Sequence, residues 1–186
     1  MLLNKTFLEN YRPKTSVRIN DSEGQRLFES VEQNEDYDVF ISYSSKDLAY
    51  AKKFAELLKD NGFGVYIDNN DSLLDKNNVT EETAKRLERV LRCSASLIYL
   101  FTDNSAESFW CPWEIGYMTG SGEGKCLIAP VFDDEKAKTM MTHREYLKIY
   151  PKVVMGMDNK KMVVAVRERD NNVVRLSDYI YNIDFK

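Results

Sequence analysis

The sequence predicts an α/β fold in which a mainly parallel β-sheet is covered by helices on both faces. The apolar runs VFISY, SASLIYLF and CLIAPVF have the length and composition of strands that are buried on both faces. Stretches with apolar residues at helical spacing separate these runs. Strands that alternate with helices indicate a parallel sheet, because right-handed crossovers place the helices on its two faces.

The first half of this pattern begins at Asp38. VFISY predicts a strand, and the SSKD that follows contains serines and an aspartate, which can cap a helix. Apolar residues recur at helical spacing from Leu48 to Leu58, and Asn61 with Gly62 supplies a left-handed stop. GVYID is the second strand. The polar stretch 69–78 is a loop of a length that usually indicates function or mobility.

The second half repeats the alternation. Asn78 and Glu81 form a capping pair for a helix that reaches Arg92, and SASLIYLFT is the third strand. A helix that begins within SFWCPWEIGY and ends near Gly120 precedes the fourth strand, CLIAPVF. Beyond it, KVVMGMD, MVVAVRE and NVVRLSDYI are expected to be added strands that end in a hairpin at RDNN.

The length of 186 residues predicts one principal domain with additions. We divide the chain into an N-terminal extension (1–35), a core (36–150) and C-terminal strands packed on that core (151–186). Within the extension, a short strand at 15–19 and a short helix at 22–33 are expected. The apolar runs are too short to span a bilayer, and the first residues lack the unbroken apolar stretch of a secretory signal, so we expect a cytoplasmic location without membrane contact.

Composition argues against several classes of function. The formal net charge is −4 and the basic residues form no block, which disfavours nucleic-acid binding. Three cysteines among apolar neighbours indicate reduced core residues, and a single histidine makes a zinc site implausible, so no metal is expected. GSGEGK follows a helix and precedes a strand, the reverse of a phosphate-binding loop. Asp103 has the position of a receiver-domain phosphoacceptor, but acidic metal ligands are absent after the first strand.

The stretch SFWCPWE raises a different question, because it holds one carboxylate among aromatic residues. Trp110 and Glu114 are four residues apart and share a face on a regular helix. If that helix begins at Pro112, Glu114 lies in its first turn, where the helix dipole favours the ionised form. Such an anion suits the stabilisation of a cationic transition state. On spacing alone, a purely structural role for this glutamate is favoured.

Taken together, DVFISYSSKD, GVYID, the TDN turn and the Ser108-x-Trp110-Cys111-x-x-Glu114 pattern resemble the TIR (Toll/interleukin-1 receptor) domain. WEIGYM and EYLKIYP further resemble stand-alone bacterial TIR proteins of antiphage systems such as Thoeris. The resemblance implies a flavodoxin-like three-layer fold with strand order 2-1-3-4-5. It also implies a ligand cleft at the carboxyl ends of the first and third strands, where the strand order reverses.

The resemblance also implies which residues act. Glu114 corresponds to the glutamate that catalytic members need to break the nicotinamide–ribose bond of NAD, and Trp110 is the tryptophan of the same motif. For Trp110, packing is slightly favoured over ligand stacking. Further substrate-binding candidates follow the first two strands: they are Tyr43, Ser44, Ser45 and Asp68, of which Asp68 is expected mainly to organise its own loop.

The function implied is that of an NAD-cleaving enzyme that makes an ADP-ribose-derived signal, either cyclic or conjugated, in antiphage defence. NAD is then a substrate, and no cofactor is needed. The expected partners are further copies of the chain, through TIR–TIR contacts, and a separate effector protein that senses the product. Two alternatives stay open: a noncatalytic TIR adaptor, and a nucleoside deoxyribosyltransferase-like enzyme that prefers deoxynucleosides.

Overall fold

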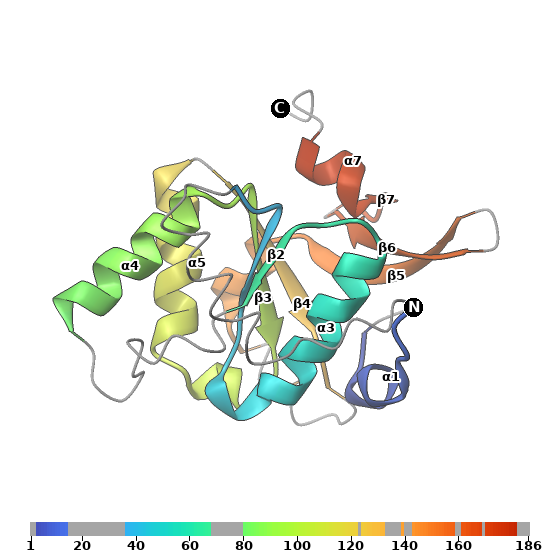
Figure 1. Ribbon diagram of the computed structural model, residues 1–186, viewed down its shortest axis with the longest axis horizontal. Helices are drawn as coiled ribbons and strands as arrows, with labels where there is room; N and C mark the ends of the chain where they lie inside the picture. Colours follow the sequence, from blue (N-terminus) through green and yellow to red (C-terminus); the bar gives the residue numbers. More distant parts are fainter. Residues whose placement is uncertain are drawn as a thin grey trace.

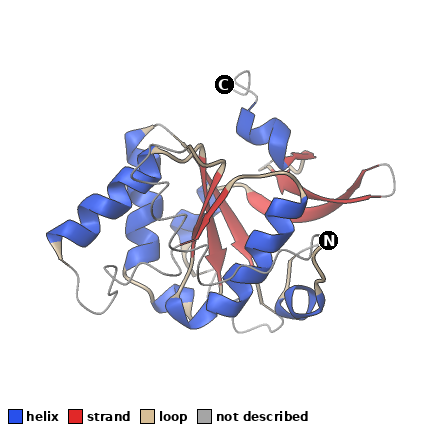
Figure 2. Cartoon of the chain, viewed as in Figure 1, coloured by secondary structure: helices blue, strands red, loops and turns tan. Residues whose placement is uncertain are grey.

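The computed structural model of the chain describes residues 3–14, 36–67, 80–122, 124–132, 139, 143–158, 161–168 and 170–181. Within this part, one sheet has the order β2-β1-β3-β4-β5-β6-β7 (Figures 1 and 2). Its strands are β1 (Val39–Ser42), β2 (Val65–Ile67), β3 (Ser96–Phe101), β4 (Lys125–Pro130), β5 (Lys152–Asp158), β6 (Lys161–Arg167) and β7 (Val173–Arg175).

Strand direction divides this sheet into two parts. The pairs β1–β2, β1–β3, β3–β4 and β4–β5 are parallel, and β6 and β7 extend the sheet in antiparallel fashion. The predicted order 2-1-3-4-5 with a C-terminal hairpin is therefore confirmed. β4 reaches β5 through residues that include the short 3₁₀ helix η3 (Glu145–Ile149).

Helices cover both faces of the sheet, which makes three layers (Figure 1). On one face lie α1 and α3, and on the other lie α4 and α5, with α7 packed beside β6 and β7. Their bounds are α1 (Lys5–Asn10), α3 (Leu48–Asp60), α4 (Glu81–Arg92), α5 (Trp110–Ser121) and α7 (Leu176–Tyr181).

The alternation of side chains along β1 assigns each residue to one of two hydrophobic cores. Val39, Ile41 and Tyr43 belong to the core under α3 and α1. Phe40 points the other way, into the core under α4 and α5. This alternation continues to Ser42, whose hydroxyl lies on the α5 side of the sheet.

Two local predictions differ from the structure, and others fall outside the residues that it describes. Thr80 caps α4, with its hydroxyl accepting from the Thr83 amide, and the predicted cap Asn78 lies outside the described residues. The stretch 172–180 is a strand only up to Arg175, because buried Leu176 and Ile180 lie four residues apart and pack as a helix. The predicted elements at 15–19 and 22–33 and the loop 69–78 also lie outside the described residues.

None of the described helices combines the length and the apolar character that crossing a membrane requires. The three cysteines are free thiols, and two of them, Cys111 and Cys126, are buried. Burial raises the pKa of the Cys126 thiol, which keeps it protonated at neutral pH.

The end of α3 provides a test of the backbone. Gly62 follows the C-cap residue Asn61 with φ +89°, and a Cβ there would meet nothing within 4 Å. We expect Gly62→Ala to lower the free energy of unfolding by about 1 kcal/mol through backbone strain alone. Gly116→Ala, within α5 and equally open, is the matched control and should raise it by roughly 0.5–1 kcal/mol. Urea denaturation of both variants measures this difference, and effects of equal sign would contradict it.

Candidate active site

A cavity of about 560 Å³ lies where the segments that follow β1 and β3 leave the sheet. Because these strands are parallel neighbours, both segments emerge at the same edge. The β1–α3 segment supplies one wall and the β3–α5 segment supplies the other. The lining residues are Ser44, Ser45 and Lys46 from the first segment, Asn104, Glu107, Ser108 and Phe109 from the second, Trp110 and Trp113 from α5, and Ala84 from α4.

Glu114 is buried beside this cavity, with 2% of its surface exposed. Its Oε2 accepts a hydrogen bond from the hydroxyl of Ser42, the last residue of β1. Glu114 is not itself among the lining residues, but Trp113 precedes it and Trp110 lies one helical turn before it. The carboxylate is therefore held between the end of the central strand and the aromatic wall of the cavity.

The helix α5 begins at Trp110, within the predicted stretch SFWCPWEIGY and before Pro112. Pro112 is thus its third residue, where a backbone N–H would still have no intrahelical acceptor, so the proline costs no hydrogen bond. The hydroxyl of Ser108, just before the N-cap residue Phe109, accepts a long bond of 3.4 Å from the Cys111 amide. Glu114 consequently lies in the second turn of α5, where the helix dipole contributes less than the sequence predicted.

The other predicted site residues separate into three groups. Ser44, Ser45 and Trp110 line the cavity. Tyr43 does not: its side chain is 3% exposed and lies in the core under α3, because strand alternation turns it away from the α5 side. Asp68 lies outside the described residues.

Sequence reasoning missed several lining residues, among them Lys46, Asn104 and Phe109. Lys46 belongs to the SSKD motif, in which the sequence pointed only to the two serines as substrate-binding residues. Phe109 is 94% exposed at the cavity although it is fully apolar. An apolar side chain left in solvent beside a polar wall is a signal that only the structure reveals, because SFW alone also fits a packed helix start.

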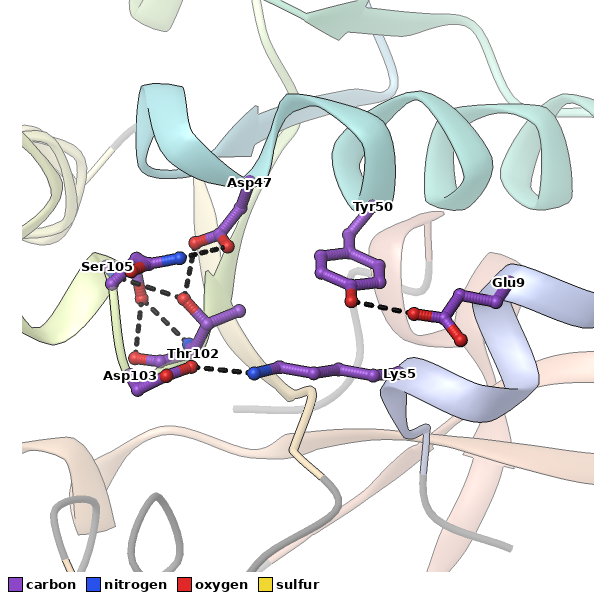
Figure 3. Close-up of polar contacts among 8 residues, drawn as sticks. Lys5, Glu9, Asp47, Tyr50, Thr102, Asp103 and Ser105 are labelled. Atoms are coloured by element: carbon purple, nitrogen blue, oxygen red, sulfur yellow. Dashed lines mark hydrogen bonds and ion pairs between the residues drawn. The ribbon is translucent and has the colours of Figure 1, made fainter.

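The two walls are joined through the carboxylate of Asp47, which is 1% exposed (Figure 3). Asp47 was predicted to cap α3, but its side chain makes no cap bond. Instead, Oδ2 accepts from the Thr102 hydroxyl at 2.5 Å and Oδ1 accepts from the Asn104 amide at 2.7 Å. Because Asn104 lines the cavity, this pair of bonds fixes one wall against the other.

Further hydrogen bonds stiffen the β3–α5 segment from within. The Thr102 amide donates to the Ser105 hydroxyl at 2.8 Å, and the Ser105 amide donates to the Thr102 hydroxyl at 2.9 Å. The hydroxyl of Tyr99, on the preceding strand β3, donates to the Ser105 carbonyl at 2.7 Å. Burial raises the pKa of Tyr99, so this phenol stays a donor at any physiological pH.

Aromatic side chains form a row along α5. The rings of Trp110 and Trp113 pack edge to face with their centroids 5.6 Å apart, and Trp113 stacks on Tyr117 with a centroid distance of 5.5 Å. The hydroxyl of Tyr117 donates to Glu88 of α4 at 2.8 Å, which anchors the row. The indole Nε1 of Trp110 is buried and has no hydrogen-bond partner among the residues that the structure describes.

Removal of the Ser42 hydroxyl should destabilise the protein measurably. In Ser42→Ala, the buried Glu114 carboxylate loses a donor, and we expect a loss of about 1–3 kcal/mol in the free energy of unfolding. Ser177→Ala removes an exposed bond to Asp178 and should change stability by less than about 0.5 kcal/mol. Urea denaturation compares the two, and similar values would show that the Ser42–Glu114 bond has no special weight.

Comparison with known proteins agrees with this geometry. The sequence profile described as "TIR domain" matches residues 39–161. The chain is 32% identical, over 163 residues, to a Bacillus cereus (strain MSX-D12) protein named "Probable 3' cyclic ADP-D-ribose synthase ThsB'", which covers 84% of this chain and 81% of that protein.

A second relative, "Putative cyclic ADP-D-ribose synthase TIR2" of Cytobacillus dafuensis, is 31% identical over 96 residues. That alignment covers 50% of this chain and 25% of the relative. The sheet order, the cavity at the carboxyl ends of β1 and β3, and the profile match all lead to one conclusion. The chain belongs to the TIR domain family.

Proposed function

We propose that this chain cleaves the nicotinamide–ribose bond of NAD and converts the ADP-ribosyl part into a cyclic nucleotide. One observation carries the proposal: the buried carboxylate of Glu114 lies beside the cavity, where the end of β1 meets the helix whose tryptophans line the cavity. The two relatives named as cyclic ADP-D-ribose synthases support the same assignment.

The chemistry explains why one carboxylate suffices. In NAD the nicotinamide nitrogen is cationic, so the bond to C1′ breaks with its electron pair going to that nitrogen, and nicotinamide leaves neutral. No acid is needed to protonate it, unlike the leaving oxygen of an ordinary glycoside. The positive charge that remains develops on the ribosyl centre. An anion held near the ribose stabilises that charge more in the transition state than in the substrate.

Ring closure requires a nucleophile from the same ADP-ribosyl group to reach C1′ before water does. A hydroxyl or ring nitrogen of that group attacks, forms the new bond and releases any proton that it loses to solvent. The aromatic side chains Trp110 and Trp113 support this course, because an apolar wall limits the water beside the reactive centre. A wetter cavity would give linear ADP-ribose.

The remaining parts of the proposal concern the setting. NAD is a substrate and no cofactor takes part. We propose a cytoplasmic enzyme in antiphage defence that assembles through contacts between TIR domains. Its product is diffusible and is read by a separate effector protein. These points follow from the family resemblance.

Glu114→Gln tests the central assignment. The amide keeps an oxygen that can accept from Ser42, so the fold is retained while the negative charge is lost. We expect nicotinamide release to fall at least about 100-fold, as for loss of an electrostatic stabiliser in other active sites. Chromatography of nicotinamide and mass spectrometry of the nucleotide product measure this.

The matched control is Glu145→Gln, which removes an exposed charge paired with Lys148 and should leave turnover unchanged. The alternative of a noncatalytic adaptor predicts that even the wild-type protein cleaves no NAD. If the wild-type protein releases no nicotinamide even under conditions that promote assembly, a noncatalytic TIR interaction module becomes the better description.

Trp110→Phe tests whether the indole binds substrate. Loss of the unpartnered Nε1–H removes an unfavourable burial, but the smaller ring also loses packing against the core, so the free energy of unfolding should fall by only about 1–2 kcal/mol. If that donor meets NAD, the KM for NAD should rise roughly five- to tenfold, the equivalent of one hydrogen bond. Steady-state kinetics and urea denaturation separate the two effects. An unchanged KM would leave Trp110 with a packing role alone.

A further inference from the structure

The N-terminal helix α1 contacts α3, which follows one wall of the cavity, and the β3–α5 segment, which forms the other wall. Leu3 and Leu8 are almost fully buried in the core that α3 covers, and the Asn4 side chain caps the helix by accepting from the Phe7 amide at 2.7 Å. On α3, the Tyr50 hydroxyl donates to Glu9 at 2.8 Å (Figure 3). Although α1 is short, its position against α3 is therefore well defined.

From this position α1 also reaches the opposite wall of the cavity. The Lys5 ammonium donates to Asp103 at 2.8 Å, across 98 residues of sequence. Asp103 lies between Thr102, which donates to the buried Asp47, and Asn104, which lines the cavity. Figure 3 shows Lys5 extended from α1 to the same segment that Asp47 contacts from the other side.

The pKa shifts of Lys5 and Asp103 both favour the charged forms of the two side chains. The hydrogen bond to Asp103 raises the pKa of Lys5, and the same bond lowers the pKa of Asp103. The field of Asp47 acts on Lys5 in the same direction. The ammonium thus offsets the charge of Asp103, its hydrogen-bond partner, in the segment that follows β3.

We propose that α1 is a positioning element of the active site, in which Lys5 holds Asp103 and thereby sets the place of the cavity wall at Asn104. Lys5 is a positioning residue, because it acts through Asp103. This inference rests on the proposed function for its kinetic effect, but not for its structural effect. It gives the N-terminal segment, which lies outside the family profile, a role in the reaction.

A surface ion pair by itself contributes little to stability, so the expected effect is on geometry. Small displacements of a site wall can change turnover about 100-fold, and we expect a milder change because Asp47 still holds Thr102 and Asn104. In Lys5→Met, kcat for NAD cleavage should fall roughly tenfold, KM should change less than about twofold, and the melting temperature should shift little.

Three further variants separate positioning from a general effect of charge or folding. Lys5→Arg keeps a cation and should recover most of the wild-type kcat. Lys53→Met breaks the partly buried Lys53–Glu56 pair on α3, a matched loss of one cation, and should leave kcat unchanged. In the double variant Lys5→Met/Asp103→Asn, turnover should be no lower than in Lys5→Met alone, because the two residues act as one unit.

Hydrogen exchange of the proteins without NAD tests the structural effect independently of activity. In Lys5→Met, the amides of 102–109 should exchange severalfold faster than in wild type, while those of α4 keep their protection. Unchanged exchange in 102–109, or a Lys53→Met variant as impaired as Lys5→Met, would overturn the proposal. If the wild-type protein cleaves no NAD but exchange responds as expected, the proposed function fails and the positioning role of α1 stands.

Discussion

Parallel pairing of β1 with β3 is the constraint on which the site depends. The register sets Phe40 opposite Leu97 and Ser42 opposite Tyr99, so both strands end at the same edge of the sheet, β3 slightly beyond β1, and their following segments enclose one cavity. The same register fixes which face each side chain occupies. A slip of one residue would turn Ser42 toward α3 and bring Tyr43 to the α5 side, which would remove the donor from Glu114. The core packing that specifies the register therefore also specifies the site.

Two buried carboxylates lie near the cavity, and their surroundings distinguish them. Both oxygens of Asp47 accept from side chains of the β3–α5 segment, which is the arrangement of a structural tie. Burying a carboxylate without partners is costly in free energy. These two bonds therefore stabilise the buried carboxylate and also constrain the β3–α5 segment. Glu114 instead lies on α5 itself, between Ser42 and the tryptophans that line the cavity. This division assigns Asp47 a structural role and leaves Glu114, of these two, as the residue to which the proposed chemistry belongs.

Local patterns predicted the parts of the fold that depend on local forces. Periodicity and turn chemistry predict helix α3, its stop at Gly62, and the buried strands β1, β3 and β4. The role of Asp47 could not be predicted, because its partners lie 55 and 57 residues away in the sequence. A short polar residue before a helix fits a cap equally well, and only the tertiary structure decides between the two.

The site residues also divide into those that local sequence position predicts and those that depend on long-range structure. Ser44, Ser45, Trp110 and Glu114 were identified from their positions after strands or within a motif, and the structure places all four in or beside the cavity. Tyr43 was chosen for the same reason, but one step of strand alternation puts it in the opposite core. Position after a strand predicts the edge of the sheet, whereas the face depends on register.

The connection through Lys5 extends this argument beyond the family's shared region. The profile match begins at residue 39, yet a helix at residues 5–10 contacts the segment that carries a cavity wall. A fold that brings two acidic segments together at one sheet edge creates a local excess of negative charge, and a cation from elsewhere in the chain relieves it. Members of one fold family can therefore share the glutamate and the sheet while differing in what holds the walls of the site. In this chain, α1 holds the wall of the site that the β3–α5 segment forms.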